Sequence, residues 1–148
     1  MKPILLNLVL ADDDMDDCLL FKEALEELSH VTELKIVNDG VELMELLIEE
    51  IESLPHVIYL DLNMPRKTGI ECLTDIMLSE KLKKIPVIIF STSFNPDVVR
   101  CLYEKGAKYY IRKPGDFSGL KKIISKSLDL ITLDSSQPAP ENFVLSSD

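Results

Sequence analysis

Four short apolar segments of the sequence each end in a side chain that can act in catalysis or bind a metal ion. Asp12 and Asp13 follow the first such segment, Asp61 follows the next, and Ser91 and Lys113 follow two later ones. Runs of this kind are typical of strands buried on both faces of a parallel sheet. Because parallel strands finish at one edge of their sheet, we expect these five side chains to converge there.

Three carboxylates, a hydroxyl and an ammonium group in one crevice suit the transfer of a phosphoryl group. The oxygen ligands of Asp12, Asp13 and Asp61, with no histidine or cysteine among them, favour Mg²⁺ over zinc or copper. Asp61 can be the nucleophile, since aspartyl phosphates are known covalent intermediates. The metal and Lys113 would offset the phosphoryl charge, and the Ser91 hydroxyl would hydrogen-bond a phosphoryl oxygen.

The same residues also have structural interpretations. The acidic run 12–17 can cap the helix that follows it, and we expect Asp14, Asp16 and Asp17 to do so. Asp61 can cap a loop, although a carboxylate at the end of a buried strand is costly unless it is paired or binds a metal. The serine can be an ordinary loop residue, and the lysine can lie on the surface. Because reactive side chains follow four different strands, a functional site is favoured over these structural roles.

Strand-like and helix-like segments alternate along the whole sequence. The strand-like segments are Ile4 to Ala11, Leu34 to Val37, Val57 to Leu60, Val87 to Phe90 and Tyr109 to Arg112. The helices are indicated by Asp16 to Leu28, by Met44, Leu47, Ile48 and Ile51, by Ile70, Leu73 and Met77, by Asp97 to Lys105, and by Leu120, Ile123, Ile124 and Leu128. This alternation predicts an α/β fold with a five-stranded parallel sheet and helices on both faces.

Size and composition exclude several classes of protein. The 148 residues fit one domain, which we expect over residues 1–131, followed by a flexible C-terminal tail over 132–148 that is disordered or docked through Phe143. The net charge of −10 disfavours binding to nucleic acid. No apolar run is long enough to span a bilayer and no signal pattern opens the chain, so we expect a cytoplasmic protein without a membrane partner. The three cysteines form no C-x-x-C pair, and we interpret them as reduced thiols.

Four motifs together resemble the receiver domains of response regulators in two-component signalling. They are LADDDMDD, VIYLDLNMPRKTG, PVIIFSTS and GAKYYIRKP, and the resemblance extends from about Ile4 to Leu128. It implies the flavodoxin-like receiver fold, with the strand order 2-1-3-4-5. It also implies a signalling phosphoacceptor, not an enzyme that turns over a substrate, although such proteins catalyse their own phosphorylation and slow dephosphorylation.

The resemblance assigns a role to each site residue. Asp61 would be the phosphoacceptor, and Mg²⁺ would be the cofactor. The metal ligands would be Asp13, Asp61 and the backbone carbonyl of Asn63, with Asp12 acting mainly through water. Lys113 would contact the phosphoryl group and precede a cis peptide bond to Pro114. Ser91 and Tyr110 would form the switch that carries the signal to the surface.

The expected partners also follow from the resemblance. They are a sensor histidine kinase or a phosphotransfer protein, and a downstream protein target, because no output domain is evident in the sequence. The responding surface would be the fourth helix, the fifth strand and the fifth helix, roughly Asp97 to Leu128, which would also serve a possible homodimer. The chain is similar to single-domain regulators that work beside bacterial phytochromes and other hybrid kinases.

Two other functions remain open at this point. One is a phosphatase of the haloacid-dehalogenase type, which also uses an aspartyl nucleophile after a strand. That family has the motif D-x-D, in which the second Asp is the general acid and base. Here Asn63 stands two residues after Asp61 and cannot shuttle a proton. The other is a pseudo-receiver that binds a partner without phosphorylation. The intact set of Asp12, Asp13, Asp61, Ser91 and Lys113 argues against it.

Overall fold

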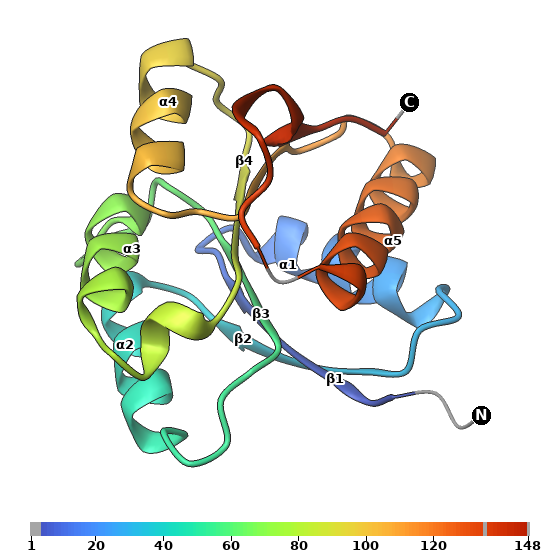
Figure 1. The fold of residues 1–148 in the computed structure, drawn as a ribbon. Helices are drawn as coiled ribbons and strands as arrows, with labels where there is room; N and C mark the ends of the chain where they lie inside the picture. The colour runs from blue at the N-terminus through green and yellow to red at the C-terminus, as the bar shows by residue number, and fades with distance from the viewer. Residues whose placement is uncertain (1–3, 135, 148) are drawn as a thin grey trace.

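The computed structural model describes residues 4–134 and 136–147, which form one parallel sheet with helices on both faces (Figure 1). The strands are β1 Leu6–Ala11, β2 Thr32–Val37, β3 Val57–Leu60, β4 Val87–Ser91, β5 Tyr109–Arg112 and β6 Val144–Leu145. The helices are α1 Met15–Glu26, α2 Gly40–Glu49, α3 Gly69–Leu78, α4 Pro96–Glu104 and α5 Phe117–Leu133, with short 3-10 turns at Leu82–Lys84 and Pro140–Asn142. The predicted α/β class is confirmed.

The strand order is β2-β1-β3-β4-β5-β6, and every pairing is parallel. The first five strands follow the predicted order, and β6 is an addition. The register aligns the ends of neighbouring strands: Ala11 pairs with Leu60, and Ser91 pairs with Arg112. The residues that follow these pairs, Asp12 and Asp61 on one side and Lys113 on the other, therefore leave the sheet at the same edge.

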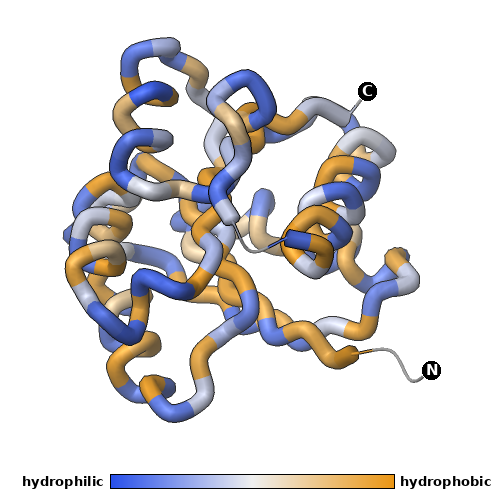
Figure 2. Tube along the Cα trace, in the orientation of Figure 1, coloured by the Kyte–Doolittle hydropathy of each residue, from blue (hydrophilic) through white to orange (hydrophobic). Residues whose placement is uncertain are grey.

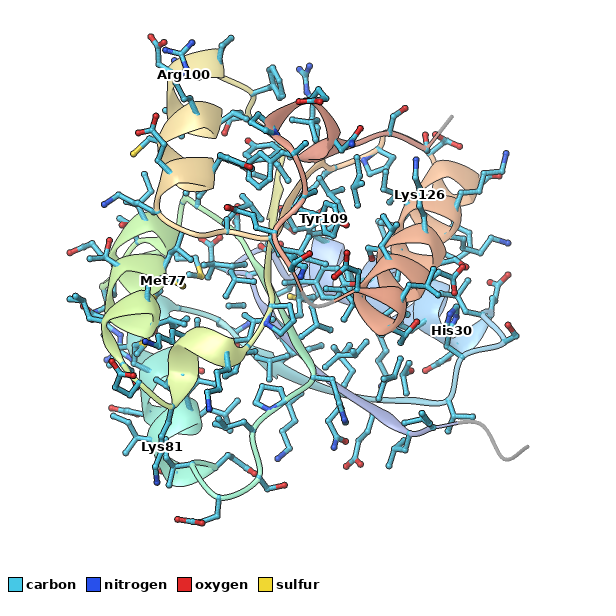
Figure 3. The ribbon with its side chains drawn as sticks, in the orientation of Figure 1. His30, Met77, Lys81, Arg100, Tyr109 and Lys126 are labelled. Atoms are coloured by element: carbon cyan, nitrogen blue, oxygen red, sulfur yellow. The ribbon has the colours of Figure 1, made fainter. Side chains whose placement is uncertain are left out.

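Two apolar cores lie on the two faces of the sheet. One packs α2, α3 and α4 against the sheet, and the other packs α1 and α5 (Figure 1). The strands run through the middle of the molecule as largely apolar segments (Figure 2). Successive residues of a strand face opposite sides, so Tyr109 lies in the core beneath α5 (Figure 3) and Tyr110 in the core beneath α4.

Side chains at the helix starts explain where the helices begin. Asp14 caps α1 by accepting from the backbone N–H groups of Asp16 and Asp17, which confirms the capping role predicted for Asp14. Asn95 caps α4, with Pro96 in the first helical turn. No helix among the described residues is both long and apolar enough to cross a membrane.

Of the two states expected for the tail over residues 132–148, the structure shows the one docked through Phe143 and not a flexible segment. Helix α5 continues to Leu133, and Val144–Leu145 form β6 beside β5. Phe143 is only 1% exposed, and its ring centroid lies 5.1 Å from that of Tyr103 and 6.4 Å from that of Tyr110. The polar composition of this segment is typical of disorder, but the Phe143 side chain packs between α4 and β5 and holds the segment in place. Residues 135 and 148 lie outside the described residues.

Replacing Phe143 by alanine should therefore lower the free energy of unfolding by about 3 kcal/mol, because it empties a filled apolar site. Urea denaturation followed by circular dichroism measures this loss. The matched control is Val144→Ala, which removes a partly exposed side chain and should cost less than about 1 kcal/mol. Equal, small losses for both variants would show that the segment is not docked in solution.

Candidate functional site

Three carboxylates gather where β1 and β3 end. One oxygen from each of Asp12, Asp13 and Asp61 lies within 4.8 Å of the others. Asp12 is 0% exposed and Asp61 is 7% exposed, whereas Asp13 faces solvent. The structure therefore brings together the three acids that the sequence predicted as a cluster, with two of them removed from water.

Backbone donors hold the two buried carboxylates in fixed orientations. Asp12 Oδ1 accepts from the backbone N–H of Asp14 at 2.9 Å. Asp61 Oδ1 accepts from the backbone N–H of Leu62 at 2.8 Å. Each acid thus commits one oxygen to the backbone and turns the other toward the centre of the site.

Lys113 supplies the positive charge that these acids require. Its Nζ donates to Asp12 Oδ2 at 2.7 Å and to Asp17 Oδ2 at 2.8 Å, and it lies 3.9 Å from Asp61 Oδ2. The side chain is 9% exposed, and the ammonium group lies 5.3 Å from the centroid of the Phe90 ring. Burial opposes the charged form, but the hydrogen bonds to the two acids outweigh it and raise the pKa of Lys113 above its usual value. Lys113 is therefore a fixed cation.

Asp17 was missed as a site residue, because the sequence predicted only a capping role for it. It lies in the first turn of α1 and, like Asp12, binds the ammonium group of Lys113. A carboxylate one helical turn after an acidic strand end is a weak signal on its own. The cis peptide bond expected between Lys113 and Pro114 is also wrong, since the structure has no cis bond there.

The electrostatics of Asp61 differ from those of a surface acid. Burial is the main cause that raises its pKa from 3.8 to about 6; Lys113 lowers it and Asp12 raises it further. Burial thus destabilises the charged form of Asp61 even though the ammonium group of Lys113 lies 3.9 Å from its Oδ2. Oxygen ligands at this spacing suit a hard divalent ion, which would relieve the repulsion.

Ser91 and Tyr110 lie beside the acids but do not join them. Ser91 is fully buried, and its Oγ lies 3.1 Å from Ser93 Oγ and accepts from the backbone N–H of Ser93 at 3.3 Å. The Tyr110 hydroxyl donates to the carbonyl of Ser93. Serine and tyrosine are thus linked through one residue of the loop that follows β4.

Asn63 is an exposed residue of the loop after β3, between the buried Leu62 and Met64. The role of its backbone carbonyl as a metal ligand stays a prediction. The carboxylates fit a divalent cation without it, since three ligand atoms already converge.

The pKa of Asp61 predicts a pH dependence for the metal-free protein. Because the folded-state pKa is raised, the contribution of this carboxyl to stability is fully present below 3.8 and is lost as the pH rises through about 6. Asp61→Asn should therefore stabilise the metal-free protein by about 2 kcal/mol near neutral pH and have little effect in acid. Urea denaturation across this pH range measures the difference.

Mg²⁺ provides the control for that measurement. It should stabilise the wild type more than Asp61→Asn, because the variant lacks one carboxylate ligand. A difference in stability that is the same at every pH would contradict the assigned pKa.

Comparison with known proteins places this geometry in a family. A family model described as the response regulator receiver domain matches residues 8–136. The response regulator Rcp1 of Synechocystis is 35% identical over 121 residues, which cover 79% of this chain and 82% of Rcp1.

Solved structures agree with the sequence match. The Mn²⁺-bound form of Rcp1 superposes with a TM-score of 0.77 at 33% identity and covers 90% of this chain and 99% of that one. The phosphorylated cyanobacterial phytochrome response regulator RcpA superposes with a TM-score of 0.81 at 32% identity, covering 92% and 100%. The carboxylate cluster, the fixed lysine and these similarities lead to one conclusion: the chain belongs to the receiver-domain response regulators, the phosphoacceptor proteins of two-component signalling.

Proposed function

We propose that Asp61 is the residue that accepts the phosphoryl group. The observation that carries this proposal is the state of its carboxylate, which is nearly buried, fixed through Oδ1 by Leu62, and has Oδ2 directed toward the cluster with Lys113 at 3.9 Å. That separation exceeds a hydrogen bond, so Oδ2 is the oxygen available to react. It attacks phosphorus, a P–O bond to Asp61 forms, and the bond from phosphorus to the donor breaks, with the electron pair leaving on the donor.

Mg²⁺ is the divalent ion that we assign to Asp12, Asp13 and Asp61, with the Asn63 carbonyl as a further ligand. When bound, it offsets negative charge on the phosphoryl oxygens. The all-oxygen donor set supports Mg²⁺ in preference to softer metals. The Mn²⁺-bound form of Rcp1 supports a divalent ion in this family.

Asp12 holds the positive charge of Lys113 close to Asp61. Lys113 is bound by Asp12 and Asp17 and is already close to Asp61. A short movement exchanges one of these carboxylates for a phosphoryl oxygen and keeps a charge-assisted hydrogen bond. The ammonium group thus stabilises the phosphorylated state without leaving its site.

The donor that we propose is a sensor histidine kinase or a phosphotransfer protein in the cytoplasm. The similarity to RcpA, named as a phytochrome response regulator, favours a kinase of the phytochrome class. The output is a downstream protein target, or a second copy of the chain, that recognises the surface of α4, β5 and α5.

Ser91 and Tyr110 connect the acceptor to that surface. A phosphoryl oxygen on Asp61 attracts the Ser91 hydroxyl away from Ser93, and Ser93 is also the residue whose carbonyl holds the Tyr110 hydroxyl. Tyr110 packs edge-on against Phe94 on one side and Phe143 on the other. A shift at Ser93 therefore changes the packing of the α4 face and of the C-terminal segment together.

Phosphorylation is tested by intact-mass analysis of the full chain with acetyl phosphate and Mg²⁺. The wild type should gain one phosphoryl mass and Asp61→Asn none, because the amide is not a nucleophile. EDTA should block labelling, and Asp13→Ala should weaken Mg²⁺ binding strongly. Equal labelling of wild type and Asp61→Asn would overturn the acceptor assignment, and undiminished labelling without metal would overturn the cofactor assignment.

The switch is tested by amide exchange with Mg²⁺ and beryllofluoride, which mimics the phosphoryl group. Protection should change from Thr92 to Tyr110 and also at Val144 and Leu145, which pair with β5. Ser91→Ala should still be labelled but should lose these changes.

The matched control is Thr92→Ala, which alters an exposed hydroxyl one residue away and should respond as the wild type does. Changes confined to the surroundings of Asp12 and Asp61 in the wild type would refute this route.

A further inference from the structure

The loop after β3, residues 62–68, contains a turn that is unfavourable for the residue at its centre. Arg66 has φ 64° and is the only non-glycine residue with positive φ in the part of the chain that the structure describes. The backbone N–H of Lys67 donates to the carbonyl of Pro65 at 2.7 Å, which closes a three-residue turn around Arg66. Residues with a Cβ adopt this conformation only when their surroundings hold them there.

The Arg66 side chain is held by an acid from a different loop. Its Nε donates to Asp39 Oδ2 at 2.8 Å, and a terminal nitrogen donates to Asp39 Oδ1 at 3.3 Å. Asp39 is buried, and it also caps α2 by accepting from the backbone N–H of Glu42 at 2.9 Å. The hydrogen bond from Arg66 is the main reason that the pKa of Asp39 is lowered. A two-bond pair with a fixed carboxylate restrains the arginine in direction as well as distance.

Close backbone contacts join the start of α2 to this turn and the start of α3 to Asp61. A Cβ on Gly40 would lie 2.2 Å from the carbonyl oxygen of Lys67, so the start of α2 presses directly on the turn. A Cβ on Gly69 would lie 2.2 Å from the carbonyl oxygen of Asp61, and the Gly69 N–H donates to the carbonyl of Leu62 at 2.9 Å. Helices α2 and α3 accordingly lie side by side (Figure 1). The loop is fixed at its base by glycine packing, and at its tip by Asp39.

We propose that the Asp39–Arg66 pair is a positioning pair that sets the Mg²⁺ affinity of the site by holding this loop in its strained form. Neither residue touches the reacting atoms. The loop carries Asn63, so holding the turn prearranges the backbone beside Asp61 before the ion arrives, and less ordering is left to occur on binding. The inference rests on the proposed function, because it requires the metal at Asp12, Asp13 and Asp61.

The Arg66 side chain is largely exposed. In the alternative interpretation, the pair therefore contributes little to stability or to Mg²⁺ affinity. Two substitutions at Arg66 separate the interpretations. Arg66→Ala removes the pair but leaves a residue that resists positive φ, whereas Arg66→Gly removes the pair and the resistance together. If the pair serves to hold the turn, glycine should compensate for its loss and alanine should not.

The experiment is Mg²⁺ titration calorimetry on the full chain. Arg66→Ala should weaken Mg²⁺ binding about fivefold or more, and Arg66→Gly should bind more tightly than Arg66→Ala. Asp39→Asn, which retains a capping oxygen, should also weaken binding. The matched control is Lys67→Ala, which removes a charged side chain of the same loop and its ion pair with Asp75 of α3. It should change the affinity less than about twofold.

Two further readouts separate positioning from damage to the fold. In labelling with acetyl phosphate, Arg66→Ala should need more Mg²⁺ for half-maximal rate yet match the wild type within about twofold at saturating Mg²⁺. In the metal-free protein, the Lys67 amide should exchange faster in Arg66→Ala than in the wild type. Arg66→Lys should restore part of the affinity, since it keeps the charge but loses the two-bond geometry.

The outcomes distinguish the two levels of the proposal. A wild type that neither binds Mg²⁺ nor is labelled at Asp61 would overturn the proposed function, and this inference with it. A wild type that binds and is labelled, beside an Arg66→Ala variant of equal affinity, would overturn the positioning pair alone. Arg66→Gly binding no better than Arg66→Ala would also overturn it, because the strained turn would then not be what the pair supports.

Discussion

The structure depends on compensating negative charge that is buried at the edge of a parallel sheet. Asp12 is wholly removed from water, and Asp61 almost so. Such carboxylates are tolerable only beside a cation, and Lys113 meets this need through Asp12 and Asp17. The remaining imbalance falls on Asp61, whose charged form burial disfavours. A divalent ion bound beside these acids would therefore relieve an existing electrostatic cost.

The rest of the fold gives that edge its geometry. Paired strands end at the same level. The backbone register alone therefore places Asp12, Asp61, Ser91 and Lys113 at one edge of the sheet. Two glycines allow close backbone contacts that a Cβ would prevent, Gly40 with the carbonyl of Lys67 and Gly69 with the carbonyl of Asp61. The sheet and these backbone contacts together hold the acids in place.

The C-terminal segment changes how the signalling surface should be understood. It lies along β5 as a sixth strand and inserts Phe143 beside Tyr103 and Tyr110, so part of the face assigned to output is already covered by the chain itself. Hydrogen bonds from Tyr103 to the Pro138 carbonyl and from Gln137 to the Ala107 carbonyl secure the covering segment. If a partner binds the proposed face, it would contact this C-terminal segment or displace it.

The sequence by itself determined the fold class, the first five strands and the acids at their ends, because strand burial and parallel termination follow from local apolar patterning. It also predicted that Asp12, Asp13, Asp61 and Lys113 gather at one edge of the sheet, which the structure confirms. Only the tertiary structure decided that Asp17 shares Lys113, that Asp39 pairs with Arg66, and that residues 144 and 145 form a sixth strand beside β5. Each of these joins residues from separate segments through side-chain direction and shape. Composition and periodicity do not predict side-chain direction or shape complementarity, because both are set only when distant parts of the chain pack together.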